Sequence, residues 1–386
     1  MRDFSECQTE INTPVCNSAE EAVAVLTKYY EEIQETLAAL PEREYLWVFS
    51  NPPRLRGEED VPIAEYKGEE SHKSDYRRYL SERYGRYKMT FSGIHVNFSF
   101  SEELLQADFA LSGKTSFREY KDDLYVKLAE RTVERGWLLT VLTAASPLLD
   151  GTFFGEKEGE IFSGDASVRC GERGYWNFFV PTFDYTDVSA YAESIRRYVK
   201  EGAIAFPSEL YYPVRIKTKG KYDLNVLTER GAEYIELRTF DLNPLTYAGV
   251  DARDVKFAQL FYVYLASTPT APITREEQEL AVYNFQSAAR FDLDDSVIRF
   301  ANGESKTVRQ AAREILSEMK EFYRDFSAEI TDILNFEEQK LYNDELRYSS
   351  QVAKEYSNGY ASKGMELSKR RQEEALSPVR TVRSNL

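Results

Sequence analysis

The sequence has few cysteines and no long apolar run. Only three of its 386 residues are cysteine, at positions 7, 16 and 170. An odd and scattered set of this kind suggests neither a disulfide framework nor a zinc site. No run of about eighteen or more apolar residues occurs, so the sequence predicts no membrane-spanning helix. Residues 1–6 lack the apolar core of a signal peptide. We therefore expect a cytoplasmic protein with reduced thiols.

Basic residues are outnumbered by acidic ones, 49 to 65, which gives a formal net charge of −16. A surface this acidic argues against nucleic-acid binding as the main task. A nucleotide substrate would need local basic side chains or metal ions to overcome that field. The 30% of charged and 42% of hydrophobic residues are ordinary for a globular protein. The length has room for one large domain or two ordinary ones.

The clearest helical pattern covers residues 18–40. Ser18 and Glu21 form a capping-box pair at its start, and Pro41 ends it. Apolar residues recur at spacings of three and four along one stripe, which consists of Val23, Leu26, Tyr30, Ile33, Leu37 and Leu40. A basic, aromatic stretch predicts a second helix that runs to about Tyr84. Residues 122–145 predict an apolar helix, and the chain from Thr274 onward is almost entirely helical in pattern.

Three segments alternate with a period of two, which is typical of half-buried strands. In residues 93–100, one face carries apolar side chains and the other carries His95, Asn97 and Ser99. In residues 233–238, the polar face carries Tyr234, Glu236 and Arg238. Residues 209–217 also alternate, and Pro213 implies an edge strand or a bulge there.

The strands and helices occur in separate runs, without βαβα alternation. This order predicts an α+β fold with an antiparallel sheet. Residues 47–62 predict a long loop, and residues 151–174 predict a functional loop or a short set of hairpins. Residues 377–386 form a short polar tail that we expect to be disordered.

A third polar face lies near the start of the chain, where the alternate residues Glu6, Gln8, Glu10 and Asn12 point the same way if residues 3–12 are extended. Pairing of all these strands in one sheet would place several carboxylates and one imidazole on the same face of that sheet. Such ligands suit Mg²⁺ or Mn²⁺ rather than zinc, and Mg²⁺ commonly bridges carboxylates to nucleotide phosphates. The pattern alone leaves alternatives open, because a polar strand face can simply be solvated and a lone histidine can be structural. The basic helix around Arg77 can likewise be an ordinary charged surface.

Six segments in order resemble motifs of the bacterial glutamate–cysteine ligases. They are residues 3–14, 59–64, 76–85, 92–99, 169–177 and 234–244, which resemble the family's DFSE, DIPIA, YR…YG, SG(I/V)HYNFS, RMS..GYxN and YIEVRSLDLNP strings. The loop at 47–55 is most similar to the ligase part of bifunctional glutathione synthases. The C-terminal helices match only loosely.

The resemblance implies a glutamine-synthetase-like fold, in which a curved antiparallel sheet is flanked by helices and followed by a mostly helical C-terminal region. It implies a catalytic domain over residues 1–376. The implied activity is ATP-dependent ligation of the γ-carboxylate of glutamate to the amine of cysteine through a γ-glutamyl phosphate, the first step of glutathione synthesis. The implied substrates are L-glutamate, L-cysteine and ATP, with neither nucleic acid nor membrane as partner.

The resemblance also implies residue roles, position by position. Asp3, Glu10, His95 and Glu236 match positions that help to hold Mg²⁺ (or Mn²⁺) and the ATP phosphates. Arg77 and Arg238 match arginines near the transferred phosphoryl group. Tyr76, Arg169 and Tyr175 match positions that line the two amino-acid pockets, and Trp176 beside them could alter that pocket.

One family motif is not found in the sequence. The family's first strand carries a G(I/L)E(K/R)E motif with metal-binding glutamates, several tens of residues before the segment that matches Asp3. Here only two residues precede Asp3. Three expectations follow: the chain is part of a longer protein, a separate chain supplies the strand, or the protein is a degenerate relative that binds nucleotide or amino acid without catalysis.

Overall fold

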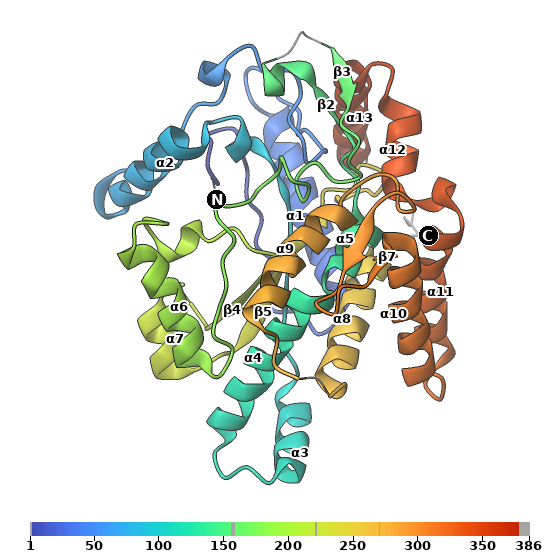
Figure 1. Ribbon diagram of the computed structural model, residues 1–386. Helices are drawn as coiled ribbons and strands as arrows, with labels where there is room; N and C mark the ends of the chain where they lie inside the picture. The colour runs from blue at the N-terminus through green and yellow to red at the C-terminus, as the bar shows by residue number, and fades with distance from the viewer. Residues whose placement is uncertain (1, 156–158, 221, 270, 378–386) are drawn as a thin grey trace.

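The computed structural model describes residues 2–155, 159–220, 222–269 and 271–377 (Figure 1). Its helices are α1 (Ala19–Ala38), α2 (Ser71–Tyr84), α3 (Glu102–Ser112), α4 (Phe117–Arg135), α5 (Trp137–Thr143), α6 (Val188–Lys200), α7 (Leu224–Arg230), α8 (Ala252–Ser267), α9 (Arg275–Ala288), α10 (Val308–Phe322), α11 (Ala328–Tyr342), α12 (Tyr348–Tyr356) and α13 (Tyr360–Leu376). Its strands are β1 (Gly93–Phe98), β2 (Leu148–Asp150), β3 (Glu160–Phe162), β4 (Val214–Lys217), β5 (Tyr234–Asp241), β6 (Val297–Arg299) and β7 (Ser305–Thr307). No helix within these described ranges is both long and apolar enough to cross a membrane.

A three-stranded antiparallel sheet with the order β1-β5-β4 positions the candidate site. One face is apolar, and its residues Ile216, Ile235 and Leu237 are fully buried where α4 packs on β4 and α5 packs on β5. The other face carries the polar residues that alternate with them. β4 lies at the edge of the sheet, as Pro213 predicts, because proline cannot donate a hydrogen bond to a neighbouring strand. The predicted α+β class with an antiparallel sheet is confirmed.

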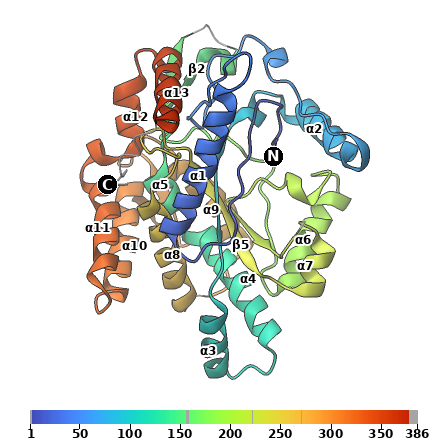
Figure 2. The ribbon, with the colours of Figure 1, turned by 180° about the vertical axis from the view of Figure 1, so that it is seen from behind.

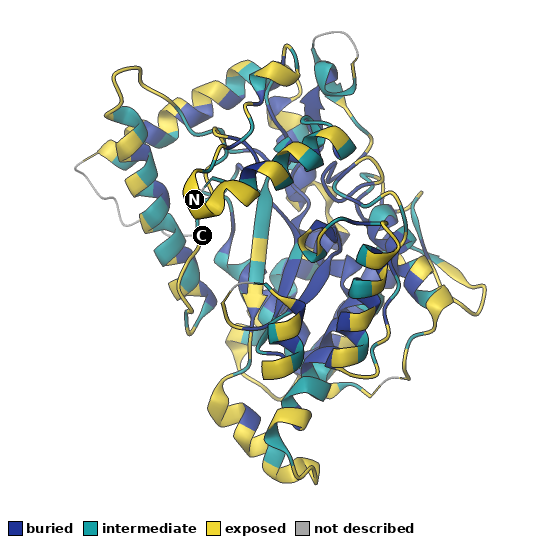
Figure 3. Ribbon diagram, turned by 90° about the vertical axis from the view of Figure 1, so that its left-hand side faces the viewer, coloured by how far each residue is buried: buried dark blue, intermediate teal, exposed yellow. Residues whose placement is uncertain are grey.

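Helices surround this sheet on its apolar side and continue into an outer layer. The pairs α4–α8, α5–α9 and α8–α11 are in contact, and α1 packs against both α8 and α13. Helices α10 to α13 form the right-hand flank in Figure 1. Helix α3 projects from the lower end and is almost entirely exposed (Figure 3).

The N-terminal segment lies between α2 on one side and the α6–α7 pair on the other in both Figure 1 and Figure 2. A small apolar cluster fixes it there, in which Phe4 packs with Leu80 of α2, with Met89 and with Tyr211. This cluster is separate from the main core. The arrangement brings the first residues of the chain near the polar side of the sheet.

Several predicted elements agree with the structure. Ser18 is the N-cap of α1 and accepts a hydrogen bond from the Glu21 amide at 3.1 Å. The strands predicted at residues 93–100 and 233–238 are β1 and β5, and the helix predicted to reach Tyr84 is α2. Residues 151–174 include one strand of the short β2–β3 hairpin, and the C-terminal region is helical apart from the β6–β7 hairpin.

Other predictions are wrong in detail. The segment at residues 3–12 is not a strand of the central sheet, because its β pairing consists of isolated bridges, Arg2 to Thr9 and Ser5 to Ile63. The helix predicted over residues 122–145 is two helices that meet at Gly136, where a Cβ would lie 2.4 Å from the Thr132 carbonyl oxygen. Leu40 lies beyond the end of α1 and is 38% exposed, so it does not join the buried stripe. Residues 378–386 of the predicted tail lie outside the described part of the chain.

Candidate functional site

Glu236 is the centre of a buried charge cluster on the polar face of the sheet. The strand register places Arg215 of β4 directly opposite it. Its Oε2 lies 2.9 Å from Arg238 Nη1 and 3.4 Å from Arg215 Nη1, and its Oε1 lies 3.6 Å from Lys217 Nζ. On the other neighbouring strand, His95 Nδ1 lies 4.0 Å from Oε1. One carboxylate is thus shared by three cationic side chains and one imidazole.

The cluster has more positive than negative charge. Burial by itself would raise the pKa of Glu236, but Arg238, Arg215 and Lys217 outweigh that effect and lower it, so the carboxylate stays ionised. Burial lowers the pKa of Lys217, and burial together with the repulsion of Arg215 lowers that of Arg238. The pKa of His95 lies below its ordinary value, because the surrounding protein displaces part of its water and Arg238 repels a second positive charge, although 37% of the side chain is exposed. His95 is therefore neutral at pH 7.

Arg169 adds a fourth cation from the segment that follows β3. Its Nη1 donates hydrogen bonds to the carbonyl oxygens of Arg238 at 2.7 Å and Phe240 at 3.4 Å, so it crosses the end of β5. Gly93 makes this path possible, since a Cβ there would lie 2.4 Å from Arg169 Cζ. The guanidinium group is thereby held at a fixed position beside the cluster.

The N-terminal segment supplies two carboxylates to the same region. Displacement of water raises the pKa of Asp3, and Arg77, Arg238 and Arg169 oppose that rise. Desolvation and the neighbouring Asp3 carboxylate raise the pKa of Glu10. Arg77 of α2 donates hydrogen bonds to the backbone carbonyls of Asp3 and of Arg2. Packing of α2 and of residues 2–10, and not membership of the sheet, brings these side chains together.

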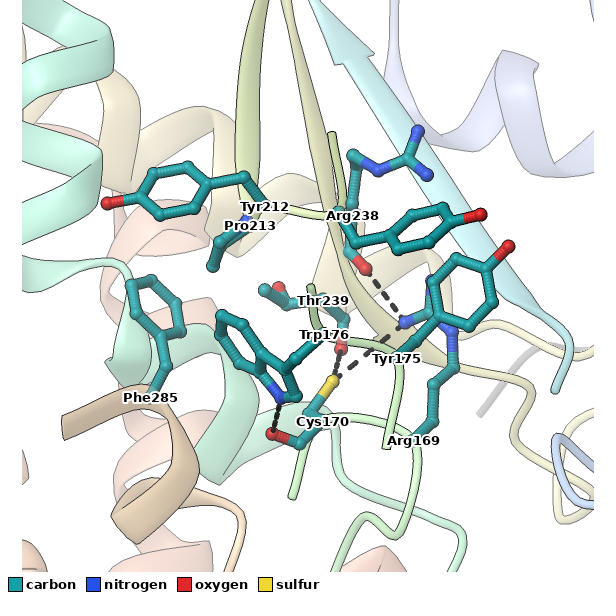
Figure 4. Close-up of a pocket in the computed structure, with 10 residues that line it drawn as sticks. Arg169, Cys170, Tyr175, Trp176, Tyr212, Pro213, Arg238, Thr239 and Phe285 are labelled. Atoms are coloured by element: carbon teal, nitrogen blue, oxygen red, sulfur yellow. Dashed lines mark hydrogen bonds between the residues drawn. The ribbon is translucent and has the colours of Figure 1, made fainter. Parts of the chain in front are cut away.

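An aromatic pocket adjoins the cluster (Figure 4). Tyr175 packs on Tyr211 with ring centroids 4.2 Å apart, and Tyr76 meets Phe206 edge to face at 5.0 Å. Burial raises the pKa of Tyr76 to about 12, so its hydroxyl stays protonated. The pocket is lined by Arg169, Cys170, Tyr175, Trp176, Tyr211, Tyr212, Pro213, Arg238, Thr239 and Phe285. Its free volume of about 30 Å³ holds roughly two water molecules, so it suits a small side chain and not a nucleotide.

All nine residues singled out from the sequence lie around this region. The Asp3 carboxylate interacts electrostatically with the guanidinium groups of Arg77, Arg238 and Arg169, and also with Glu10. His95 interacts with Glu236 in the same way. Tyr175 interacts with Asp3 and with Tyr76. Sequence reasoning missed Arg215 and Lys217. Both sit over the Tyr222 ring at 4.9 Å. The sequence pattern could have identified these two residues, because both side chains fall on the polar face of the alternating segment at residues 209–217.

The acidic residues fit a metal ion only as a partial set of ligands. Within the described ranges, no three His, Cys, Asp or Glu side chains lie close enough together to hold a metal ion. The four predicted ligands instead form two pairs, Asp3 with Glu10 and His95 with Glu236. Mg²⁺ is commonly bound by one or two carboxylates together with substrate phosphates and water. A neutral His95 and mutually repelling Asp3 and Glu10 carboxylates suit such shared coordination.

The chain is similar to known proteins along most of its length. The family model for glutamate–cysteine ligase matches residues 1–207 and 179–288. The bifunctional glutathione biosynthesis protein of Clostridium perfringens is 34% identical over 382 residues, covering 95% of this chain and 49% of the relative. The Listeria monocytogenes protein of the same name is 32% identical over 363 residues, covering 91% and 47%. The chain thus spans about half the length of these curated relatives.

Two crystal structures share the fold. The bifunctional glutathione synthetase of Pasteurella multocida superposes with a TM-score of 0.83 at 24% identity, over 98% of this chain and 48% of that one. The glutamate–cysteine ligase of Francisella tularensis, solved in complex with AMP, gives a TM-score of 0.84 at 21% identity, over 97% and 82%. The match to the family model extends over both the N-terminal segment and the sheet that build the charged site. This chain therefore belongs to the glutamate–cysteine ligase family.

Proposed function

We propose that the chain catalyses the ATP-dependent ligation of the γ-carboxylate of L-glutamate to the amine of L-cysteine. The observation that carries this proposal is the buried cationic face around Glu236. Arg215, Lys217 and Arg238 are each at most 13% exposed, and Glu236 is the carboxylate that pairs with all of them. Buried positive charge in excess of its counter-charge favours binding of a polyanion.

The proposed reaction has two steps, and the basic residues act in the first. ATP phosphorylates the γ-carboxylate, and the amine of cysteine then displaces phosphate from the acyl phosphate. Phosphoryl transfer depends on positioning and on charge neutralisation. Arg238, which Glu236 holds in place, presents a planar guanidinium that can grip phosphate oxygens at two points. Lys217 and Arg215 extend the same positive surface along the edge strand.

A divalent cation fits the acidic part of the site. We propose that Mg²⁺ or Mn²⁺ arrives with the nucleotide, and that Asp3 and Glu10 on one side and His95 and Glu236 on the other are its protein contacts. The ion would neutralise charge on the phosphate oxygens. The ionised state of Glu236 and the neutral state of His95 are the states that coordination requires.

The amino-acid substrates belong to the aromatic side of the site. Arg169 carries a fixed positive charge next to Tyr175 and suits the α-carboxylate of an amino acid. Tyr76 of α2 packs in the same apolar cluster as Tyr175. The pocket's free volume of about 30 Å³ suits the short side chain of cysteine as the amine substrate. We further propose that residues 1–376 act as the ligase unit, in the cytoplasm, which suits its unpaired cysteines.

The decisive test measures formation of the ligated product and release of ADP, in the wild-type chain and in a matched pair of lysine variants. Purified chain with ATP, Mg²⁺, glutamate and cysteine should form γ-glutamylcysteine, identified by mass, with ADP release that requires both amino acids. Lys217→Met should lower kcat/KM for ATP by about tenfold or more, the effect of losing one charged contact. Lys219→Met is the control, because Lys219 is 84% exposed, and it should retain wild-type activity.

The outcomes separate three cases. Nucleotide or amino-acid binding without ligated product would refute catalysis by this chain alone and favour a binding-only relative. Product that forms only after addition of a peptide with the family's GIEKE-type strand would favour a two-part enzyme. Equal activity of the two lysine variants would refute the assignment of the cationic face.

A further inference from the structure

Glu209 is a buried carboxylate that the proposed chemistry does not use. Its side chain is fully buried at the end of a short 3₁₀ turn, Pro207–Glu209. Its Oε1 accepts hydrogen bonds from the Tyr84 hydroxyl at 2.8 Å and the Tyr79 hydroxyl at 3.2 Å, and lies 3.0 Å from Arg83 Nε. These three partners all lie on α2. A buried carboxylate held by one cation and two hydroxyls is a strong anchor for the helix.

The same residue holds two further segments. Its Oε2 accepts a hydrogen bond from the Ala205 amide at 2.6 Å, which closes the turn between residues 205 and 209. Its backbone carbonyl accepts a hydrogen bond from Asn177 Nδ2 at 2.9 Å. Asn177 Nδ2 also lies 3.1 Å from the Tyr84 hydroxyl, and Asn177 Oδ1 accepts from the Tyr211 amide at 2.8 Å. Glu209 and Asn177 thus join three segments that are distant in the sequence.

Two of these segments line the aromatic pocket, through Tyr175 before Asn177 and Tyr211 after Glu209. Helix α2 borders the pocket through Tyr76, which packs in the same apolar cluster as Tyr175 and Tyr211. Tyr175 packs on Tyr211 and Tyr76 packs on Phe206 through their rings, and neutral hydrogen bonds join Tyr175 to Tyr211 and Tyr76 to Ser208. Ring contacts tolerate sliding, whereas hydrogen bonds to a charged group fix distance and direction. A shift of about 1 Å in such walls changes substrate binding strongly.

We propose that Glu209 is a positioning residue that sets the width of the amino-acid pocket, through its ion pair with Arg83 and its hydrogen bond from Tyr84. The proposal rests on the proposed function, because it concerns the amino-acid side of that site. The cationic face for ATP is built on β4 and β5, and the backbone ladder between these strands fixes its position. Of its side chains, Arg215 also donates a hydrogen bond to the Leu210 carbonyl at 2.7 Å, next to Glu209. Weakening of Glu209 therefore affects binding of the amino acids more than binding of ATP.

The test compares Glu209→Gln with Glu65→Gln. Glu65 pairs with Arg78 of the same helix at 2.8 Å, but 54% of its side chain is exposed, so loss of its charge should change little. Glu209→Gln should raise KM for glutamate or cysteine by about tenfold, as expected for loss of a charged contact. KM for ATP and kcat should stay within about twofold. A purely structural role predicts the opposite split, with a lower active fraction, a lower kcat and an unchanged KM.

Two further variants keep the proposal falsifiable if Glu209→Gln folds poorly. Tyr84→Phe keeps the ring and removes only the hydroxyl, and it should raise the same KM in the same direction. The double variant Arg83→Gln/Glu209→Gln removes both charges, and it should recover much of the thermal stability lost in Glu209→Gln without restoring KM. Wild-type KM for both amino acids in Glu209→Gln and in Tyr84→Phe would overturn the proposal.

Direct binding separates this proposal from the proposed function. If the wild-type chain forms no product, the proposed function fails, and calorimetric titration with glutamate and cysteine then decides the role of Glu209. An unchanged dissociation constant in Glu209→Gln would overturn it, and so would a wild-type chain that binds neither amino acid. A weakened affinity in Glu209→Gln, with that of Glu65→Gln unchanged, would support it.

Discussion

Replacement of Glu236 by glutamine should destabilise the protein strongly, although the two side chains have nearly the same shape. The carboxylate is 10% exposed and faces Arg238, Arg215 and Lys217 within 3.6 Å. The neutral amide would leave these buried cations without their counter-charge. Loss of one partner of a buried ion pair costs about 3–5 kcal/mol. We expect Glu236→Gln to lower the free energy of unfolding by about that amount at pH 7.

The pH dependence gives this prediction a second, independent part. The cations lower the pKa of Glu236 in the folded protein, whereas an unfolded glutamate titrates near about 4.3. A lowered carboxylate pKa stabilises the fold fully above the unfolded value, and that contribution disappears as pH falls through the folded value. The difference between wild type and Glu236→Gln should therefore be equal at pH 7 and pH 5.5. It should decrease only in stronger acid.

Urea unfolding followed by circular dichroism measures both parts, at several pH values and constant ionic strength. Glu65→Gln is the control, since its pair with Arg78 is exposed and should be worth about 0–1 kcal/mol. A loss below about 1 kcal/mol for Glu236→Gln would refute the reasoning. A difference that already decreases between pH 7 and pH 5.5 would refute the lowered pKa.

Three other substitutions test packing and position. Gly93→Ala should displace Arg169, since the new Cβ would lie 2.4 Å from Arg169 Cζ. The KM for the amino acids should then rise by about tenfold, as for loss of one charged contact. Kinetics that match wild type would contradict this prediction. Gly364→Ala would place a Cβ 2.3 Å from Trp47, and thermal unfolding should show a loss of about 1–3 kcal/mol. Lys340→Met should cost about 3–5 kcal/mol in urea unfolding, because Lys340 lies between the buried carboxylates of Asp254 and Glu337 at 2.9 and 2.8 Å.

Local patterns in the sequence determined much of the fold. The period of two at residues 93–100 and 233–238 identified β1 and β5 and their polar faces, because alternation depends only on neighbouring residues. Ser18 identified the start of α1 for the same reason, and Pro213 identified the edge strand. The family motifs identified the residues that gather around Glu236. These features are local in the chain, and a pattern can therefore reveal them.

Only the tertiary structure decided how the charges meet. The register between β4 and β5 places Arg215 and Lys217 against Glu236, and a shift of one residue would have moved both to the apolar face. Packing of Phe4 on α2 brings Asp3 to the site without any strand at residues 3–12. The Glu209 anchor joins residues that lie up to 130 positions apart. Such contacts depend on long-range packing and burial. The sequence therefore identifies most residues of this site, whereas the tertiary structure determines which side chains each of them pairs with.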